Sequence, residues 1–226
     1  MGTLEALSLA MGTAWTSGIN LYATVAVLGI AGQADMIQLP PDLQVLSHPA
    51  VIAVACIMYV IEFFADKVPY VDSGWDALHT FIRVPAGAIL AARSLGDLNP
   101  ALELMAVLAG GTVALAAHGT KATTRLAINA SPEPFSNWIA SVTEDLAVLG
   151  SIWLIFNHPI VMLILVLAFL ALVVWLAPKL YRFAKRGFQA LRDRLRSVKP
   201  RSARADGVDA AELTALGMRN LSAESC

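Results

Sequence analysis

The sequence predicts an all-α, polytopic helical membrane protein of about six spans, with a duplicated helical hairpin and broken helices. Of the 226 residues, 57% are hydrophobic and 15% are charged, and the mean hydropathy is +0.65. An ordinary soluble domain of this length is less apolar. The apolar residues also fall in separate runs that are long enough to cross a bilayer as helices.

The first half of the chain is predicted to contain two spans, at 3–31 and 49–65. The first carries Gly18 and Asn20 in its middle, which indicates either a packing contact between helices or a break with a functional role. The loop at 32–47 contains prolines and no Lys or Arg, so we expect it on the outer side of the membrane. Proline and charged residues end the second span.

The second half of the chain is predicted to add four spans. They lie at 74–93, 101–118, 120–156 and 160–177. The first follows Asp72 and Ser73, which are good N-cap residues. The second has small residues at four-residue spacing, which allows a neighbouring helix to approach closely. Prolines interrupt the third near residue 132, and the last contains no charged residue.

The C-terminal segment is strongly basic. Ten of the sixteen Lys and Arg residues lie between Lys179 and Arg204, against one acid. Because Lys and Arg beside a span stay in the cytoplasm, we expect a protein of the bacterial inner membrane with a cytoplasmic C-terminus. The predicted organisation is a transmembrane domain over 1–178, a basic amphipathic helix over 179–199 that binds anionic lipid head groups, and a disordered tail over 200–226. A nucleic-acid partner is not expected, whereas a homo-oligomer is compatible with the sequence.

An internal repeat is predicted from the alignment of the sequence with itself at an offset of 63 residues. Residues 69–89 then match seven of the 21 residues aligned with them, including Ser73 with Ser136 and Trp75 with Trp138. Random pairing gives roughly one or two identities at average composition. The repeat copies are predicted at about 49–93 and 112–156. Related repeats often meet around a substrate site in transporters, although a duplicated scaffold without a site is the alternative.

Ionisable residues gather in two short clusters, at 62–83 and 121–145, between strongly apolar segments. A charged group that faces lipid costs several kcal/mol, so such residues tend to face a protein interior or a water-filled cavity. On a helix that begins at Asp72, spacings of four, three and four place the charged residues on one face. The predicted solute- or ion-binding residues are Glu62, Asp66, Lys67, Asp72, Asp76, His79, Arg83, Lys121, Arg125, Asn129, Glu133, Glu144 and Asp145.

A structural role for these clusters is the main alternative. Asp76 could pair with Arg83, or Glu62 with Arg125, only to hold the helices together, but so many charges suggest retention for function. His79 could relay protons or could be a hydrogen-bonded structural residue. No compact metal-binding, phosphate-binding or nucleophile motif is present, so no metal and no cofactor are predicted.

Three stretches of the sequence resemble the DUF4126 family of bacterial membrane proteins. They are EFFADKVPYVDSGWDALHTFIRVPAGA at 62–88, HGTKATTR at 118–125 and NASPEPFS at 129–136. The resemblance covers residues 18 to about 180, and the basic tail departs from it in length and content. It implies a multi-pass membrane architecture and assigns no biochemical activity.

The residues therefore support three hypotheses about function. The leading one is a transporter or permease for a small polar or ionic solute, in which the acidic residues bind a cation or proton and Arg83, Lys121 and Arg125 hold an anionic group. The second is an intramembrane protein or enzyme that binds a lipid head group, which would need a lateral opening beside His79. The third is a scaffold or assembly protein, in which all the charges would be paired and no cavity would exist.

Overall fold

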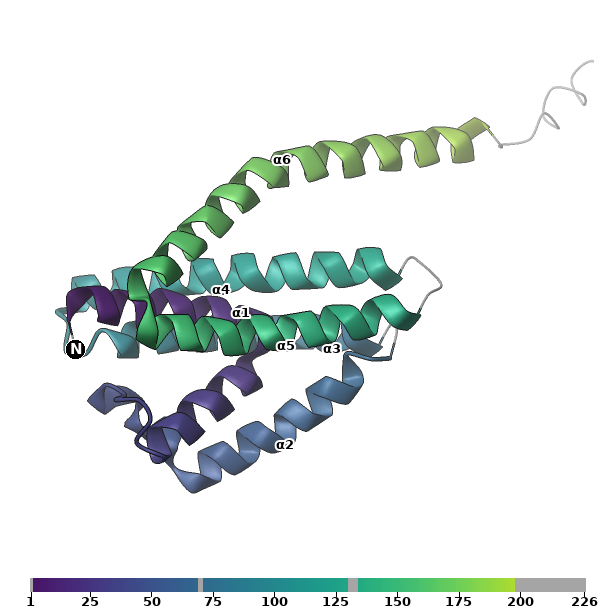
Figure 1. The fold of residues 1–226 in the computed structure, drawn as a ribbon. Helices are drawn as coiled ribbons and strands as arrows, with labels where there is room; N and C mark the ends of the chain where they lie inside the picture. The colour runs from purple at the N-terminus through teal and green to yellow at the C-terminus, as the bar shows by residue number, and fades with distance from the viewer. Residues whose placement is uncertain (1, 69–70, 130–133, 198–226) are drawn as a thin grey trace, which may run out of the picture. The chain divides into compact units, whose positions relative to one another are not determined.

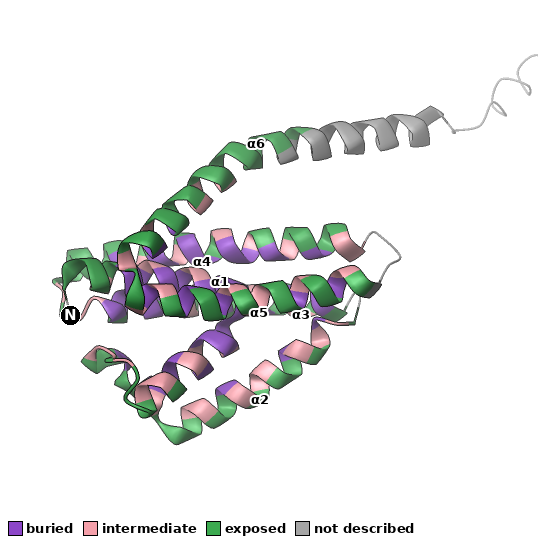
Figure 2. Cartoon of the chain, in the orientation of Figure 1, coloured by how far each residue is buried: buried purple, intermediate pink, exposed green. Residues whose placement is uncertain are grey.

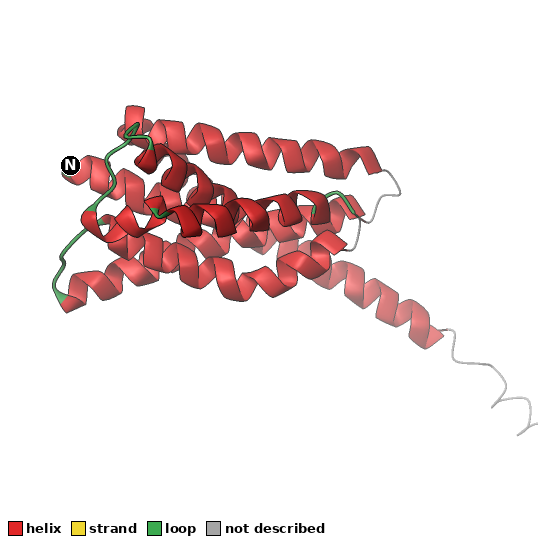
Figure 3. Cartoon of the chain, turned by 90° about the horizontal axis from the view of Figure 1, so that it is seen from below, coloured by secondary structure: helices red, strands yellow, loops and turns green. Residues whose placement is uncertain are grey.

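The computed structural model describes residues 2–68, 71–129 and 134–197. These residues form helices and no strand, which confirms the predicted all-α class (Figure 3). In chain order the helices are α1 (Thr3–Gln33), the short 3₁₀ helix η1 (Pro41–Ser47), α2 (Pro49–Ala65), α3 (Val71–Ser94), α4 (Pro100–Asn129), α5 (Pro134–Asn157) and α6 (Pro159–Ser197).

The lengths and compositions of these helices are those of a multi-pass membrane protein. Four segments are long and apolar enough to cross a bilayer, and η1 with α2, bent by 64°, would be a fifth. α2, α4 and α5 each have an exposed face (Figure 2), and many of the exposed residues on these helices are large and apolar, as contact with a bilayer would require. α3 is too polar to meet the same criterion, but Asp72, Asp76 and Arg83 on this helix are all buried. The four segments are Thr3–Gln33, Pro100–Asn129, Phe135–Asn157 and Pro159–Lys179.

α1 is the most buried of the four segments, and it is broken at Asn20. The backbone of Asn20 has φ −147° and ψ 98°, which is not helical. Its Oδ1 accepts a hydrogen bond from the Ala23 N–H at 3.0 Å, in the way that an N-cap residue satisfies the first turn of a new helix. The Thr24 hydroxyl donates to the Asn20 carbonyl at 2.8 Å. Local hydrogen bonds therefore stabilise the break inside the protein.

The break reverses the course of α1, so that both of its ends lie at the same end of the helix bundle (Figure 1). In the first half, the Ser8 hydroxyl donates to the Ile155 carbonyl near the end of α5, at 3.5 Å. In the second half, Gly29 packs closely against Leu46 of η1 and against Ile52 near the start of α2. Of the two alternatives considered for Gly18 and Asn20, the structure thus shows a break in the helix, at Asn20.

α4 is one continuous helix from Pro100 to Asn129, which corrects the predicted boundary between spans at residues 118–120. Gly119 alone does not end the helix, because a helical glycine costs only about 1 kcal/mol relative to alanine. The neighbouring Thr120 and Thr123 hydroxyls donate to carbonyls one turn earlier, at 2.8 and 2.6 Å. The next helix, α5, begins at Pro134, so the predicted span at 120–156 combined the end of α4 with α5.

α3 and α5 have related bounds. Adding 63 to the bounds of α3 (71–94) gives those of α5 (134–157), and the same offset places α2 (49–65) onto 112–128, within α4. This is the offset at which the sequence aligns with itself. The duplicated hairpin remains a prediction, and the helix bounds are compatible with it.

The described residues fall into two units, the first ending at Val174 and the second beginning at Trp175. α6 continues as a helix to Ser197, so the predicted basic helix at 179–199 is helical over its described part. In the second unit, the Lys179 ammonium lies 3.0 Å from the centre of the Trp175 ring. The predicted disordered tail, 200–226, lies outside the described residues.

Candidate functional site

Seven buried or largely buried ionisable residues from four helices form one connected set of ion pairs, which we call the charge network. Glu62 lies near the C-terminal end of α2 and Asp66 directly follows that helix, α3 and α4 contribute facing positions, and α5 contributes one acid from its middle. Apart from the Glu144 side chain, which is 16% exposed, every side chain of the set is at most 4% exposed. The residues are Glu62, Asp66, Asp76, Arg83, Lys121, Arg125 and Glu144.

Arg83 joins α3 to α2 within this network. Its Nη2 donates to Glu62 Oε1 at 2.6 Å, and its Nη1 donates to Asp76 Oδ1 at 3.0 Å. The Asp76 pair lies on one helix at a separation of seven residues, which is about two turns. Nη1 also lies 3.3 Å from His118 Nδ1 of α4. One guanidinium therefore links three helices.

Lys121 lies at the centre of the network, surrounded by carboxylates. Its ammonium nitrogen is 3.0 Å from Asp66 Oδ2 and 3.3 Å from Glu62 Oε1. The same atom is 3.4 Å from Glu144 Oε2 and 3.8 Å from Asp76 Oδ1. A buried ammonium group is stable only with such partners, because its desolvation costs several kcal/mol.

Arg125 connects α4 to α5 and to the end of α2. It forms a two-pronged pair with Glu144, through Nε to Oε1 at 3.1 Å and Nη2 to Oε2 at 2.7 Å. Nη2 also reaches Asp66 Oδ2 at 3.3 Å, and Nη1 donates to the carbonyls of Asp66 and Asn137, both at 3.1 Å. The planar guanidinium suits this arrangement, because its donors point outward in a fixed fork.

The charge network has more acids than bases. Four acids (Glu62, Asp66, Asp76, Glu144) face three bases (Arg83, Lys121, Arg125), a formal charge of −1 when all are ionised. Within the described part of the chain, three buried carboxylate oxygens of these acids have no hydrogen-bond partner. They are Glu62 Oε2, Asp66 Oδ1 and Asp76 Oδ2.

Two further predicted acids lie beside the network and have uncharged partners. Asp72 accepts from the Asn129 side-chain amide at 2.7 and 3.0 Å, and Asn129 in turn accepts from Asn137 at 2.8 Å. Asp145 accepts from the Asn20 amide at 3.2 Å and from the Tyr59 hydroxyl at 3.1 Å. Because Asn20 lies at the break in α1, its hydrogen bond to Asp145 places the break next to the charge network.

The two buried histidines have fixed hydrogen-bonding roles. His79 stacks on Trp75, and its nitrogens face the Trp75 carbonyl at 2.8 Å and the Tyr22 hydroxyl at 3.0 Å. His118 Nδ1 faces Arg83, which can only donate, so this nitrogen accepts. His118 Nε2 faces the Asp76 carbonyl at 3.1 Å, which can only accept, so this nitrogen carries the proton. His118 was not among the predicted site residues.

Lys67 lies just beyond the C-terminal end of α2 and outside the charge network. Its ammonium nitrogen contacts the Phe63 carbonyl at 3.0 Å and Ser141 Oγ at 3.4 Å, and it sits 2.9 Å from the centre of the Phe63 ring. Burial lowers the pKa of Lys67, against the opposing effect of Asp145 and Asp66. The remaining predicted residue, Glu133, lies outside the described residues.

Sequence reasoning thus named most of the acids and bases that the structure brings together. It missed partners that carry no charge or that belong to other segments. Tyr22, Tyr59 and Asn137 carry no sequence signal for a site beyond being polar in or beside apolar segments. Asn20 had such a signal, because a polar residue follows Ser17 and Gly18 in a predicted span, but nothing in the sequence pointed to its contact with Asp145.

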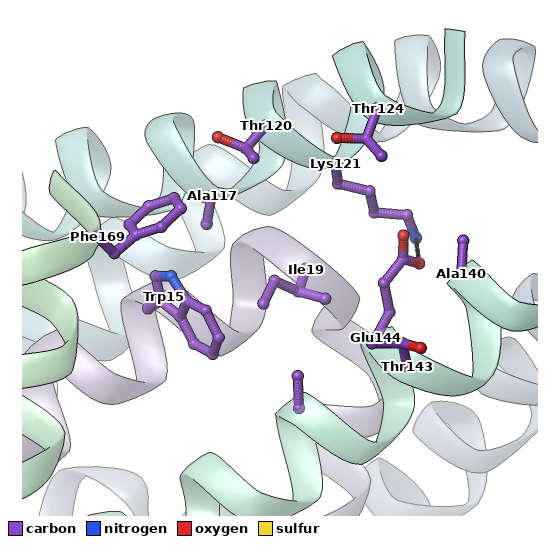
Figure 4. A pocket seen from close by; sticks show the side chains of 11 residues that line it. Trp15, Ile19, Ala117, Thr120, Lys121, Thr124, Ala140, Thr143, Glu144 and Phe169 are labelled. Atoms are coloured by element: carbon purple, nitrogen blue, oxygen red, sulfur yellow. Dashed lines mark ion pairs between the residues drawn. The ribbon is translucent and has the colours of Figure 1, made fainter. Parts of the chain in front are cut away.

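A cavity of about 310 Å³ reaches the charge network from one side (Figure 4). It lies between α1, α4, α5 and α6, and its lining is largely apolar, with Trp15 and Phe169 at one end. At the other end Lys121 and Glu144 point toward one another. His79, beside which the lipid hypothesis required a lateral opening, does not line this cavity. Among the described residues, no three His, Cys, Asp or Glu side chains come together as a metal site would require.

Comparison with known protein families matches residues 7–179 to the family described as "Domain of unknown function (DUF4126)". The chain belongs to the DUF4126 family. The matched region of this DUF4126 protein contains every helix that contributes to the charge network. Comparisons with curated proteins and with solved structures gave no match.

Proposed function

We propose that this DUF4126 protein is a membrane transporter for a small polar or ionic solute, which binds where the break in α1 meets the charge network. The observation that carries the proposal is the position of Asn20. This residue interrupts α1 inside the protein, and its amide donates to Asp145. Solute sites in transporters commonly lie at interrupted helices within the membrane. Irregular backbone at that depth occurs where protein buries it or where it lines a water-filled cavity.

The charge balance favours a solute with positive charge over an anion. Each of the three bases of the network has carboxylate partners, so an anion would compete with these carboxylates for Arg83, Lys121 or Arg125. By contrast, three buried carboxylate oxygens in the described region have no partner. A proton or a small cation would compensate this excess of acid.

The surroundings of the site fit a transporter of the bacterial inner membrane with a cytoplasmic C-terminus. Ten basic residues between Lys179 and Arg204 support a cytoplasmic C-terminus, because Lys and Arg close to a span tend to stay on the cytoplasmic side. The same segment would bind anionic lipid head groups. Lys67 lies just after the C-terminal end of α2. By the same rule, this basic residue favours a cytoplasmic position for that end of α2. A homo-oligomer is compatible with the exposed apolar faces.

Asn20→Ala is expected to reduce solute movement by about tenfold or more, because a hydrogen bond to a charged group contributes about 1.5–3 kcal/mol. The measurement uses purified protein in liposomes on a solid-supported membrane. Transient currents are recorded after concentration steps of Na⁺, K⁺, ammonium, chloride and phosphate. The wild type should give a current with at least one of these ions, and the variant should give a much smaller one.

Asn157→Ala is the matched control for this experiment. Its amide donates to the Trp153 carbonyl on the same helix at 2.9 Å, at an exposed position away from the network. The control should behave like the wild type. Currents of equal size in the wild type and Asn20→Ala would contradict the proposed role of the break. A folded wild type that moves none of the five ions would contradict transport of simple ions.

The cavity supports a second candidate function, in which the protein binds a membrane lipid. Its apolar lining and its polar end at Lys121 and Glu144 suit an amphiphilic molecule that enters sideways from the bilayer. This candidate would be favoured if no ion moves and added phospholipid raises the midpoint of thermal unfolding. It requires no role for the break at Asn20, so the flux experiment separates the two functions.

A further inference from the structure

The cavity beside the charge network combines an apolar interior with one acidic residue. It extends from Trp15 and Phe169 at one end to Lys121 and Glu144 at the other (Figure 4). Among the described residues, Glu144 is the only acid that lines it. The cavity therefore offers a ligand surroundings unlike those inside the network, where acids and bases contact one another.

Glu144 is more accessible from the cavity than Lys121. Its side chain is 16% exposed, against 2% for the lysine. The Lys121 ammonium lies 3.0–3.8 Å from oxygens of four different carboxylates, so its charge is largely compensated. Arg125, the other partner of Glu144, also contacts Asp66. A ligand in the cavity therefore meets an acid more readily than a base.

Acids outnumber Lys and Arg residues around this end of the cavity. The charge network contains four acids and three bases. Asp72 and Asp145 lie against it as further acids, and Lys67 lies near Asp66 and Asp145 as a further base. The described residues thus place six acids and four bases together. A cation gains more from such surroundings than an anion of the same size, and apolar walls strengthen the interaction because they keep water away.

The aromatic end of the cavity also favours a cation. The ring centres of Trp15 and Phe169 are 5.9 Å apart and their planes meet at 78°, which is an edge-to-face arrangement. The face of an aromatic ring carries partial negative charge and attracts cations, and its surface packs well against apolar groups. These two rings therefore suit a ligand that carries a positive charge on an apolar body.

A bare inorganic cation fits this cavity less well. Such an ion needs several oxygen ligands to replace its water shell. The described lining offers the carboxylate of Glu144 and otherwise mostly apolar groups. In the part of the chain that the structure describes, no three acidic, histidine or cysteine side chains form a metal site. An organic cation needs no such shell, because its own apolar groups surround the charge.

The size and the position of the cavity limit the ligand further. Its volume of about 310 Å³ lies near the lower end of the range for small-molecule pockets, roughly 300–1,000 Å³. Such a space suits a compact molecule better than a phospholipid with two acyl chains. Thr120 and Thr124 of α4 and Thr143 of α5 line the cavity and are exposed, so the cavity is open between these helices. A cation with an apolar body can enter there from the bilayer.

We propose that the cavity binds an organic cation with a compact apolar or aromatic body. The cation lies with its positive charge toward Glu144 and with its body against Trp15 and Phe169. Such a site is additional to the proposed transport of a small solute, because the cavity holds the cation whether or not the charge network moves an ion. The ligand also differs from a membrane lipid in its size and its charge.

Binding of tetraphenylphosphonium tests this proposal on the purified protein, first in an uncharged detergent and then in lipid nanodiscs. This probe is a compact aromatic cation, and tetraphenylborate has nearly the same shape and the opposite charge. Each radiolabelled ion is added separately, and its saturable binding is measured against an excess of the same unlabelled ion. We expect about one saturable tetraphenylphosphonium site per chain and at least about tenfold weaker binding of tetraphenylborate.

Two variants locate the site. Ala147→Leu keeps every charge and fills part of the cavity, whereas Glu144→Gln keeps the size of the side chain and removes the acid. Each should weaken tetraphenylphosphonium binding by about tenfold or more, because the cation loses either its space or its charged partner. Ala127→Leu and Glu103→Gln are the matched controls, because both residues are exposed and neither lines the cavity. Should Glu144→Gln fail to fold, Ala147→Leu still tests the site.

The proposal would be overturned by a folded wild type without saturable tetraphenylphosphonium binding, or by equal binding of tetraphenylborate. Binding that persists at full strength in a folded Ala147→Leu protein would place the cation elsewhere and would also overturn it. Binding that is present in detergent and lost in nanodiscs would identify phospholipid as the occupant of the cavity, against the proposal.

This binding experiment is separate from the test of transport. A wild type that binds tetraphenylphosphonium and gives none of the five ion currents would retain the cation site and contradict transport of simple ions. An ion current in a protein that binds no tetraphenylphosphonium would retain transport and overturn the cation site. The failure of one proposal is therefore visible separately from the failure of the other.

Discussion

Arg83→Met is expected to destabilise the folded protein by about 3–5 kcal/mol, because removal of one partner leaves a buried charge without compensation. Arg83 is fully buried and holds both Glu62 and Asp76. Without the guanidinium, two carboxylates would remain in the protein interior with Lys121 as their only shared base. The midpoint of thermal unfolding in detergent, followed by tryptophan fluorescence, should fall well below that of the wild type.

Arg93→Met is the control on the same helix. Arg93 also pairs with an acid, Asp42, but its side chain is 54% exposed and the atoms are 3.5 Å apart. An exposed pair contributes about 0–1 kcal/mol, so the unfolding midpoint should change little. Similar midpoints for Arg83→Met and Arg93→Met would show that the buried network adds no more stability than a surface pair.

Arg125→Lys is expected to loosen α5 even though it keeps the charge. Arg125 uses three nitrogens to reach Glu144, Asp66 and the Asn137 carbonyl, and a lysine has one nitrogen at the end of its side chain. Several hydrogen bonds to charged groups would be lost, each worth about 1.5–3 kcal/mol. Trp138 and Trp153 of α5 should report the change as a lower unfolding midpoint in fluorescence.

Arg182→Lys is the matched control for this substitution. Arg182 is exposed and donates from Nε to the Pro178 carbonyl on its own helix, at 3.1 Å. The same chemical change there should leave the unfolding midpoint near that of the wild type. If Arg125→Lys also unfolds like the wild type, the charge of residue 125 is sufficient and the fork of hydrogen bonds does not hold α5.

The fold class can be predicted from the sequence, because long apolar runs along the chain indicate membrane-spanning helices. The inward position of Asp72, Asp76, His79 and Arg83 follows from helical spacing, which places them on one face. The Asp76–Arg83 pair could be predicted for the same reason, since both residues lie on one helix. Information of this kind is local, and it depends little on how the helices pack.

The remaining features depend on contacts between segments that are far apart in the sequence. Arg125 was considered as the partner of Glu62, whereas it pairs with Asp66 and Glu144, and Glu62 pairs with Arg83 and Lys121. Neighbouring acids one helical turn apart on α2 are equally plausible partners until the register between helices is known. The reversal of α1 at Asn20 could not be predicted from the sequence either. Glycine and asparagine occur both in continuous and in broken membrane helices, so their presence does not indicate which of the two forms.

The central claim is that the charge network serves transport. Its most direct test is the ion-driven current of the Asp76→Asn variant in liposomes. The current is measured with an ion that gives a current in the wild type. Removal of one acid balances the network, so we expect the variant to remain folded, with an unfolding midpoint at or above that of the wild type, and to give no current. Asp42→Asn should retain the current. A folded Asp76→Asn protein with wild-type current would contradict the account, and loss of folding together with current would show that the network holds the helices together.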